Sequence, residues 1–144
     1  MDNGLGRFLE AQENDYAIAL KEIREGKKRS HWMWYIFPQI RGLGHSSMAR
    51  YYGISDIDEA RDYLRQPILG ARLKEISGEL LKHDEHDPKH IFGHIDAMKL
   101  RSCMSLFVII EEENNQHNSV FRQVLQQYYD DIPDEATLKH IHER

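Results

Sequence analysis

The sequence has almost no cysteine, no long apolar run and no excess of positive charge. Its single cysteine, Cys103, excludes an internal disulfide and a zinc site built on cysteine thiolates. No apolar run approaches the roughly 20 residues of a membrane span, and residues 1–4 lack the basic and apolar parts of a secretory signal. The 19 basic and 24 acidic residues give a net charge of −5, which disfavours nucleic acid as a partner. We therefore expect a cytoplasmic protein without membrane contact.

The chain does contain enough apolar material for a core, because 40% of its 144 residues are hydrophobic and 30% are charged. Apolar residues recur at spacings of three and four, with serine, aspartate, proline or glycine at the ends of the runs, which is typical of amphipathic helices. Residues 1–144 are therefore predicted to form an all-α fold, a compact single-domain bundle of about seven helices, several of them short. The longer helices are expected at 8–25, 55–65, 67–83, 96–112 and 119–129 and after Asp134, with shorter pieces at 46–52 and 87–93.

The aromatic run from His31 to Phe37 has no clear period. Its composition suits a strand, but no partner strand is apparent elsewhere, and a lone strand leaves its backbone polar groups unpaired. We therefore expect one or two helical turns that end before Pro38. Elsewhere, Ser55 and Asn118 are expected to cap the helices that follow them.

Residues 26–55 differ in composition from the rest of the chain. They contain five basic residues and no Asp or Glu, together with six of the 14 aromatic residues, including both tryptophans, Trp32 and Trp34. Such a mixture suits an anionic ligand with a flat ring, because the ring stacks on aromatic faces while phosphate oxygens bind Arg and backbone N–H groups. The alternative is that the aromatic residues are core and the basic residues belong to a solvated loop.

The loop after Gln39 sharpens this hypothesis. Its glycines permit a close approach of backbone to ligand, and the serines that follow begin a helix, where free N–H groups favour an anion. The loop is neither a Walker A sequence nor a dinucleotide-binding fingerprint, so an ordinary turn with a serine cap at Ser46 or Ser47 is the alternative. The expected ligand contacts are His31, Trp32 and Trp34 for the ring, Gln39 for a polar edge, and Arg41, Gly44, Ser46, Ser47, Arg50 and Lys99 for the anion.

Two histidines, His31 and His45, flank the aromatic and basic segment. Imidazole titrates near neutral pH, so either is a candidate proton carrier for a hydrolytic or transfer reaction. Asp96 and Lys99 lie three residues apart at the start of a helix, where they either pair with each other or contact the ligand.

A second group of histidines lies between His83 and His94. Pro88 and Gly93 interrupt any single helix there, and the HExxH motif is absent. We therefore expect no functional metal site in this segment, with adventitious capture of nickel or zinc as the alternative, and no cofactor is predicted.

The predicted function is the binding of a small phosphate-bearing or nucleotide-like anion at residues 26–55. The alternative is a protein-interaction module, because exposed Trp, Tyr and Arg side chains are also typical of binding hot spots. No residue pattern identifies a protein partner.

The chain resembles an uncharacterised bacterial family, the domain of unknown function 1810, over nearly its whole length. The similarity is strongest at Ser30-His-Trp-Met-Trp-Tyr-Ile-Phe-Pro-Gln39 and Gly42-Leu-Gly44, and it includes Tyr52-Gly-Ile54 and Lys99-Leu-Arg-Ser102. The resemblance implies a compact all-α domain and brings no established activity. Members are often labelled calpastatin, but calpain inhibitors of that name are disordered repeats, so this function is not carried over. Cys103 and Ser105 stand where relatives are expected to have Ser and Thr, which argues against a nucleophilic serine at position 103.

Overall fold

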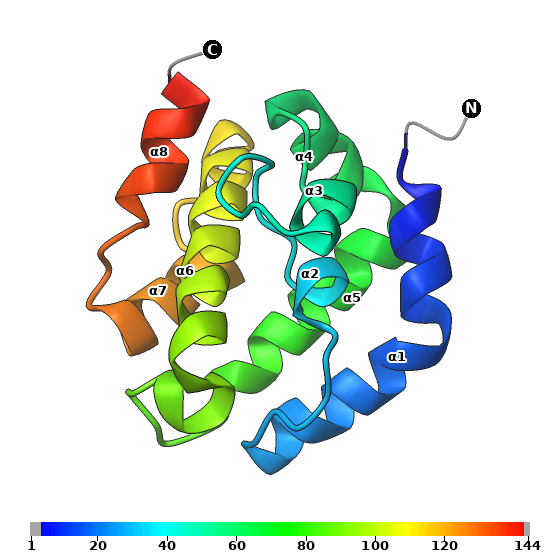
Figure 1. The fold of residues 1–144 in the computed structure, drawn as a ribbon. Helices are drawn as coiled ribbons and strands as arrows, with labels where there is room; N and C mark the ends of the chain where they lie inside the picture. Colours follow the sequence, from blue (N-terminus) through cyan, green and yellow to red (C-terminus); the bar gives the residue numbers. More distant parts are fainter. Residues whose placement is uncertain (1–3, 143–144) are drawn as a thin grey trace.

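The fold is built from helices alone. The computed structural model describes residues 4–142, and within this range eight helices and no strand are formed (Figure 1). The predicted all-α fold is therefore confirmed. The helices are α1 (Gly6–Glu25), α2 (Met33–Ile36), α3 (Ser47–Tyr52), α4 (Ile57–Arg65), α5 (Pro67–Leu80), α6 (Lys89–Glu113), α7 (Val120–Tyr129) and α8 (Glu135–His142).

Local sequence explains most of the helix ends. α1 ends at Gly26, whose φ of 78° is left-handed and favours glycine. The predicted caps at Ser55 and Asn118 were each wrong by one residue. Asp56 accepts a hydrogen bond from the Glu59 N–H, and Ser119 accepts one from the Arg122 N–H. Each cap lies one residue later than predicted, because Asp56 and Ser119 are the extended residues whose side-chain oxygens reach the N–H three residues further along.

Helix α6 joins two elements that were predicted separately. The short piece at 87–93 and the helix at 96–112 follow one another directly, with a break at Gly93, where φ is 78° and ψ is 171°. This conformation is open almost only to glycine. The break sets the direction of the long second part of α6, which carries Asp96 and Lys99.

The helices surround a single cluster of buried side chains. α5 contacts α1, α4 and α7, whereas α6 contacts α4, α7 and α8. A chain of aromatic rings crosses the core, with centroids 5.0 Å apart between Phe8 and Tyr63, 5.5 Å between Tyr63 and Phe107, and 5.7 Å between Phe107 and Phe121. These contacts link α1, α4, α6 and α7. In residues 4–142, none of the helices is long and apolar enough to cross a membrane.

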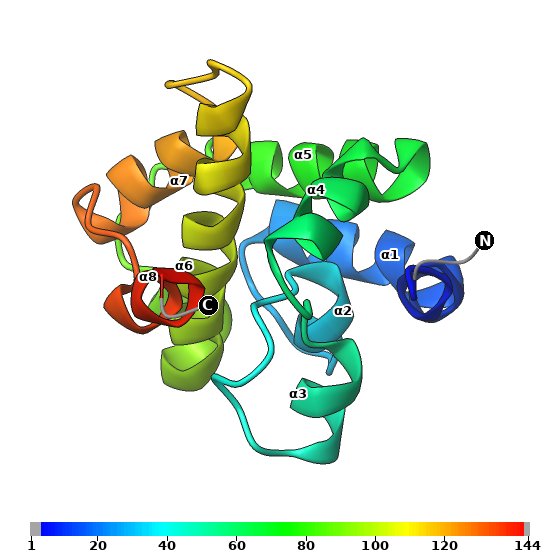
Figure 2. The same cartoon turned by 90° about the horizontal axis from the view of Figure 1, so that it is seen from above.

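The aromatic run 31–37 forms the short helix α2, as predicted, and not a strand. Seen from above, α2 and α3 fill the space between α1 and α6 (Figure 2). One isolated parallel bridge ties this region together: the Arg41 N–H bonds the Ile54 carbonyl at 2.7 Å, and the Ile54 N–H bonds the Gln39 carbonyl at 2.9 Å. The loop after Gln39 is thereby held beside the end of α3.

Candidate binding site

The buried carboxylate of Glu22 organises the start of the aromatic segment. Glu22 lies on the inner face of α1 and is 7% exposed. It accepts hydrogen bonds from the Arg29 N–H at 2.8 Å, the Ser30 N–H at 3.0 Å, the Ser30 hydroxyl at 2.6 Å and the Trp32 indole N–H at 2.9 Å. Residues 29–32 are therefore folded around one carboxylate from outside the segment.

These bonds also determine the charge of Glu22. Burial on its own raises the pKa of the carboxyl group, but the bonds from Ser30, Arg29 and Trp32 outweigh it and lower the pKa to about 2, from an ordinary value of 4.5. Glu22 is therefore ionised near neutral pH, and its negative charge is satisfied within the protein. Sequence reasoning missed this residue, although a glutamate next to Ile23 on the apolar face of α1 was an available signal.

Trp32 is a structural residue. Its side chain is 1% exposed, and its only polar atom is bonded to Glu22. The expected wall of His31, Trp32 and Trp34 is therefore not formed as a unit: Trp32 has no face for a ligand, whereas His31 is exposed to solvent. Trp34 alone of the two tryptophans remains half-buried.

Lys99 and Trp34 come together from α6 and α2. The Lys99 Nζ lies over the Trp34 ring, 4.8 Å from its centroid, which is a cation–π distance. Asp96 bonds both neighbouring lysines, with its Oδ1 3.5 Å from Lys99 Nζ and its Oδ2 2.9 Å from Lys28 Nζ. The structure thus unites three residues that the sequence placed in the ligand-binding set, Trp34, Asp96 and Lys99.

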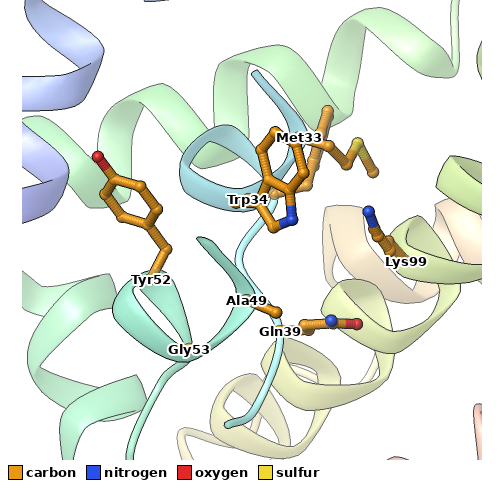
Figure 3. A pocket seen from close by; sticks show the side chains of 8 residues that line it. Met33, Trp34, Gln39, Ala49, Tyr52, Gly53 and Lys99 are labelled. Atoms are coloured by element: carbon orange, nitrogen blue, oxygen red, sulfur yellow. The ribbon is translucent and has the colours of Figure 1, made fainter. Parts of the chain in front are cut away.

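A hollow opens beside this pair, which we call the Trp34 hollow. It has room for about 10 Å³, about one water molecule, and the Lys99 ammonium, the Trp34 indole and the Gln39 amide belong to its lining (Figure 3). Its remaining lining comes from α2 and α3, and consists of Met33, Phe37, Ala49, Tyr52 and Gly53. One cation, one amide and several aromatic faces therefore meet at one place.

A second hollow lies between the loop, α6 and α8, and we call it the Met98 hollow. Its volume is about 260 Å³, and it shares Gln39 and Lys99 with the Trp34 hollow. Its lining is otherwise Leu43, Gly44, Ile95, Met98, Ser102, Asp134 and Ala136. Ile95 and Met98 are 68% and 61% exposed, which is unusual for large apolar residues. Their exposure could not be foreseen from their helical spacing.

The two arginines of the expected anion site have other partners or positions. The Arg41 guanidinium donates to the carbonyls of Arg50 and Gly53, both at 3.1 Å, and so satisfies the end of α3. Arg7 from α1 bonds the same Gly53 carbonyl at 3.0 Å. Arg50 is exposed, and neither it nor Arg41 lines the two hollows.

The glycines of this region serve close packing. A Cβ at Gly44 would lie 2.8 Å from the Ala49 Cβ, and one at Gly53 would lie 2.8 Å from the Ala49 carbonyl oxygen. Gly42 has a φ of 108° and faces His140 of α8, whose ring a Cβ would approach to 2.5 Å. The Gly42-Leu-Gly44 motif therefore fits the loop against α3 and α8, although Gly44 also lines the Met98 hollow.

The remaining expected residues lie apart from the hollows. The Ser46 hydroxyl caps α3 by accepting from the Ala49 N–H at 3.1 Å, so the predicted alternative of an ordinary cap is realised at that residue. Ser47 and His45 are exposed. Like His31, they line neither hollow.

Other chemistry-bearing residues of the chain are engaged in structure. Cys103 is buried, and burial raises the pKa of its thiol well above its ordinary range, which disfavours the reactive thiolate. The Ser102 hydroxyl donates to Asp134 at 3.1 Å and to the Met98 carbonyl at 3.2 Å. In the described part of the chain, no group of three or more His, Cys, Asp or Glu side chains is placed to hold a metal ion.

Comparison with known proteins identifies the family. The family described as "Protein of unknown function (DUF1810)" matches residues 2–141, so the chain belongs to it. It is also similar, at 40% sequence identity, to the conserved hypothetical protein Rv1873 from Mycobacterium tuberculosis, whose crystal structure superposes with a TM-score of 0.90 over 96% of each chain. No curated protein matches this chain.

Proposed function

We propose that this DUF1810 protein binds a small phosphate-bearing or nucleotide-like anion at the mouth of the Trp34 hollow. The observation that carries the proposal is the position of the Lys99 ammonium, 4.8 Å from the Trp34 ring and beside the Gln39 amide at an opening. Concave sites with a few convergent polar groups among apolar walls are the usual form of small-molecule sites.

Each of the three residues has a separate task. Lys99 offers an ammonium to a phosphate oxygen, a charge-assisted bond that is about twice as strong as a neutral one. Gln39 offers both an amide donor and an acceptor, which suits the polar edge of a ring or sugar. Trp34 provides the aromatic face and holds the ammonium in place. The proposal concerns binding, since neither His31 nor His45 lines the hollows.

The test is a thermal-shift and calorimetric screen with inorganic phosphate, sugar phosphates and nucleotides. A ligand that binds only the folded protein raises Tm by mass action. We expect Lys99→Met to remove the shift and Trp34→Ala to weaken it. The matched control is Lys82→Met, because Lys82 pairs with Glu79 at the same i,i+3 spacing as Lys99 with Asp96 but lies away from the hollows. Binding that survives Lys99→Met, or no binding of any anion, would overturn the proposal.

A second candidate, a protein-interaction surface, is favoured by the outer side of α3. Tyr51 is 57% exposed there, next to the partly exposed Met48. Exposed Tyr side chains are common in binding hot spots. Concentration-dependent sedimentation tests self-association through this side, which Tyr51→Ser would abolish. A monomer at all concentrations would remove the case for self-association.

A further inference from the structure

The two hollows are neighbours, because Lys99 and Gln39 line both, and we call them together the groove. A ligand with a phosphate at Lys99 can therefore place its remaining part in the Met98 hollow. The Trp34 hollow alone has room for about 10 Å³, about one water molecule, far below the roughly 300–1,000 Å³ of small-molecule sites. The bulk of a ligand with a phosphate at Lys99 therefore extends into the Met98 hollow.

The groove offers one positive charge. Among the described residues that line the two hollows, Lys99 is the only cation and Asp134 the only anion. Asp96 does not cancel Lys99, because it also bonds Lys28 and the three groups together carry one net positive charge. Arg41 has its guanidinium on the carbonyls of Arg50 and Gly53 and does not face the groove. A second or third phosphate would find no cation there.

Asp134 adds a penalty for further phosphates. Its Oδ2 is fixed by bonds from the Ser102 hydroxyl at 3.1 Å and the Thr137 N–H at 3.0 Å, so the carboxylate stays at the edge of the Met98 hollow. Like charges at short range repel in a site partly shielded from water. A ligand that extends from Lys99 toward Asp134 must therefore end in a neutral or donor-bearing part.

The remaining walls of the Met98 hollow are apolar. Leu43, Ile95, Met98 and Ala136 line it, and Ile95 and Met98 have most of their surface uncovered. A flat, weakly polar ring covers such side chains well, and Met adapts its shape to a ring face. Ring edges that carry N–H groups also suit the carboxylate of Asp134.

We infer that the ligand of this site is a phosphate monoester of a flat ring compound, such as a nucleoside monophosphate, with its single phosphate at Lys99 and its ring in the Met98 hollow. This inference rests on the proposed function and narrows its ligand class. It assigns Met98 and Asp134 to ligand selection, a role that the sequence did not predict for them.

The experiment is isothermal calorimetry with the mono-, di- and triphosphates of adenosine and uridine, with adenosine, uridine and ribose 5-phosphate as ring-only and phosphate-only probes. We expect the monophosphate to bind at least as tightly as the di- and triphosphate, and about tenfold more tightly than the nucleoside or ribose 5-phosphate. Met98→Ser is expected to weaken monophosphate binding about fivefold. The control Ile68→Ser removes a similarly exposed apolar residue at the start of α5 and should change nothing.

The outcomes separate the inference from the proposed function. Affinity that rises stepwise with each added phosphate, or Met98→Ser binding like the wild type, overturns the inference while Lys99-dependent binding still supports the proposed function. Asp134→Asn extends the test. This substitution should weaken the preference for the monophosphate, so that the diphosphate binds several-fold more tightly than it binds to the wild type. Failure of every nucleotide to bind, or binding independent of Lys99, overturns both.

Discussion

Trp32 and Trp34 are two residues apart in one motif, and they differ in burial and in the partners of their indole rings. Each ring has a lysine ammonium over it, Lys28 at 4.9 Å from the Trp32 centroid and Lys99 at 4.8 Å from the Trp34 centroid. Trp32, however, is buried and bonded to Glu22, whereas Trp34 lines a hollow. The same pairing of indole and ammonium thus stabilises the fold on one side of α2 and forms a surface for a ligand on the other.

Asp96 connects the surroundings of Trp32, which we call the Trp32 half, with those of Trp34, which we call the Trp34 half. It bonds Lys28, whose side chain is 8% exposed, and Lys99, whose side chain is 23% exposed. The buried lysine also donates to the Ser30 carbonyl, and the more exposed one has Asp96 as its ion-pair partner. Near Trp32, Lys28 therefore has two bonding partners, Asp96 and the Ser30 carbonyl. Near Trp34, Lys99 has one ion-pair partner and keeps N–H groups that can bind a ligand. We therefore expect substitutions in the Trp32 half to lower the free energy of unfolding, and substitutions in the Trp34 half mainly to weaken ligand binding.

The largest effect is expected from Glu22→Gln. The Arg29, Ser30 and Trp32 N–H groups then meet an amide oxygen in place of a charged acceptor, and the Ser30 hydroxyl loses its acceptor because an amide nitrogen cannot accept a hydrogen bond. We expect the free energy of unfolding to fall by about 3 kcal/mol, in line with the loss of bonds to a buried charged group. Urea denaturation of the wild type and the variant measures this loss in the free energy of unfolding.

Glu25→Gln is the matched control for this variant. Glu25 lies three residues further along α1 and pairs with Arg29 at 2.9 Å, but both side chains are about half exposed. Its loss should cost no more than about 0.5 kcal/mol. Equal effects of the two substitutions would contradict the structural role assigned to Glu22.

The second prediction concerns the pH dependence of the same carboxylate. Because the pKa of Glu22 is lowered from 4.5 to about 2 in the folded protein, its contribution is fully present above about pH 4.5 and is lost as the pH falls toward 2. The wild type should therefore lose stability more steeply than Glu22→Gln between these pH values. Denaturation curves at several pH values measure both slopes. Parallel slopes would show that Glu22 titrates normally.

The helices and their order could be predicted because their signals are local. Apolar spacing, Gly26, Pro67 and Asp134 mark helix bodies and ends within a few residues. The break at Gly93 was predicted correctly, because the backbone there is non-helical and separates the short piece before it from the long second part of α6. Local signals therefore sufficed for secondary structure, including the choice of helix for residues 33–36.

The site could be predicted only in part, because it depends on contacts between distant segments. The composition of residues 26–55 predicted both tryptophans as ligand contacts. However, the carboxylate that bonds Trp32 comes from α1, and the lysine over Trp34 comes from α6. Lys99 was predicted as a ligand contact because it lies with Asp96 at the start of a helix. Composition alone could not show that Arg41 would bond backbone carbonyls instead of facing a ligand.

The third prediction compares the two tryptophans directly. Trp32→Phe leaves a small cavity and deprives Glu22 of one donor, so we expect a loss of about 2 kcal/mol in the free energy of unfolding. Trp34→Phe keeps an aromatic face under Lys99 and borders an open hollow, so its cost should stay below about 1 kcal/mol. Chemical denaturation of both variants gives the comparison. A larger loss for Trp34→Phe would reverse the assignment of the two halves.

The smallest effects are expected from the two lysines, and they complete the comparison. Lys28→Met keeps the aliphatic length but leaves the Asp96 Oδ2 and the Ser30 carbonyl without their buried donor, so we expect a loss of about 1 kcal/mol. Lys99→Met removes a longer, more exposed ion pair and should cost at most about 0.5 kcal/mol. The order is expected to invert for anion binding, because Lys99→Met removes the ammonium at the groove, whereas Lys28→Met keeps this ammonium, leaves Asp96 to Lys99 alone and so weakens binding less. Unfolding and calorimetric titration of the same two proteins measure both orders. Similar effects of the two substitutions in both measurements would contradict the comparison. They would mean that the Trp32 and Trp34 surroundings contribute alike to stability and to anion binding.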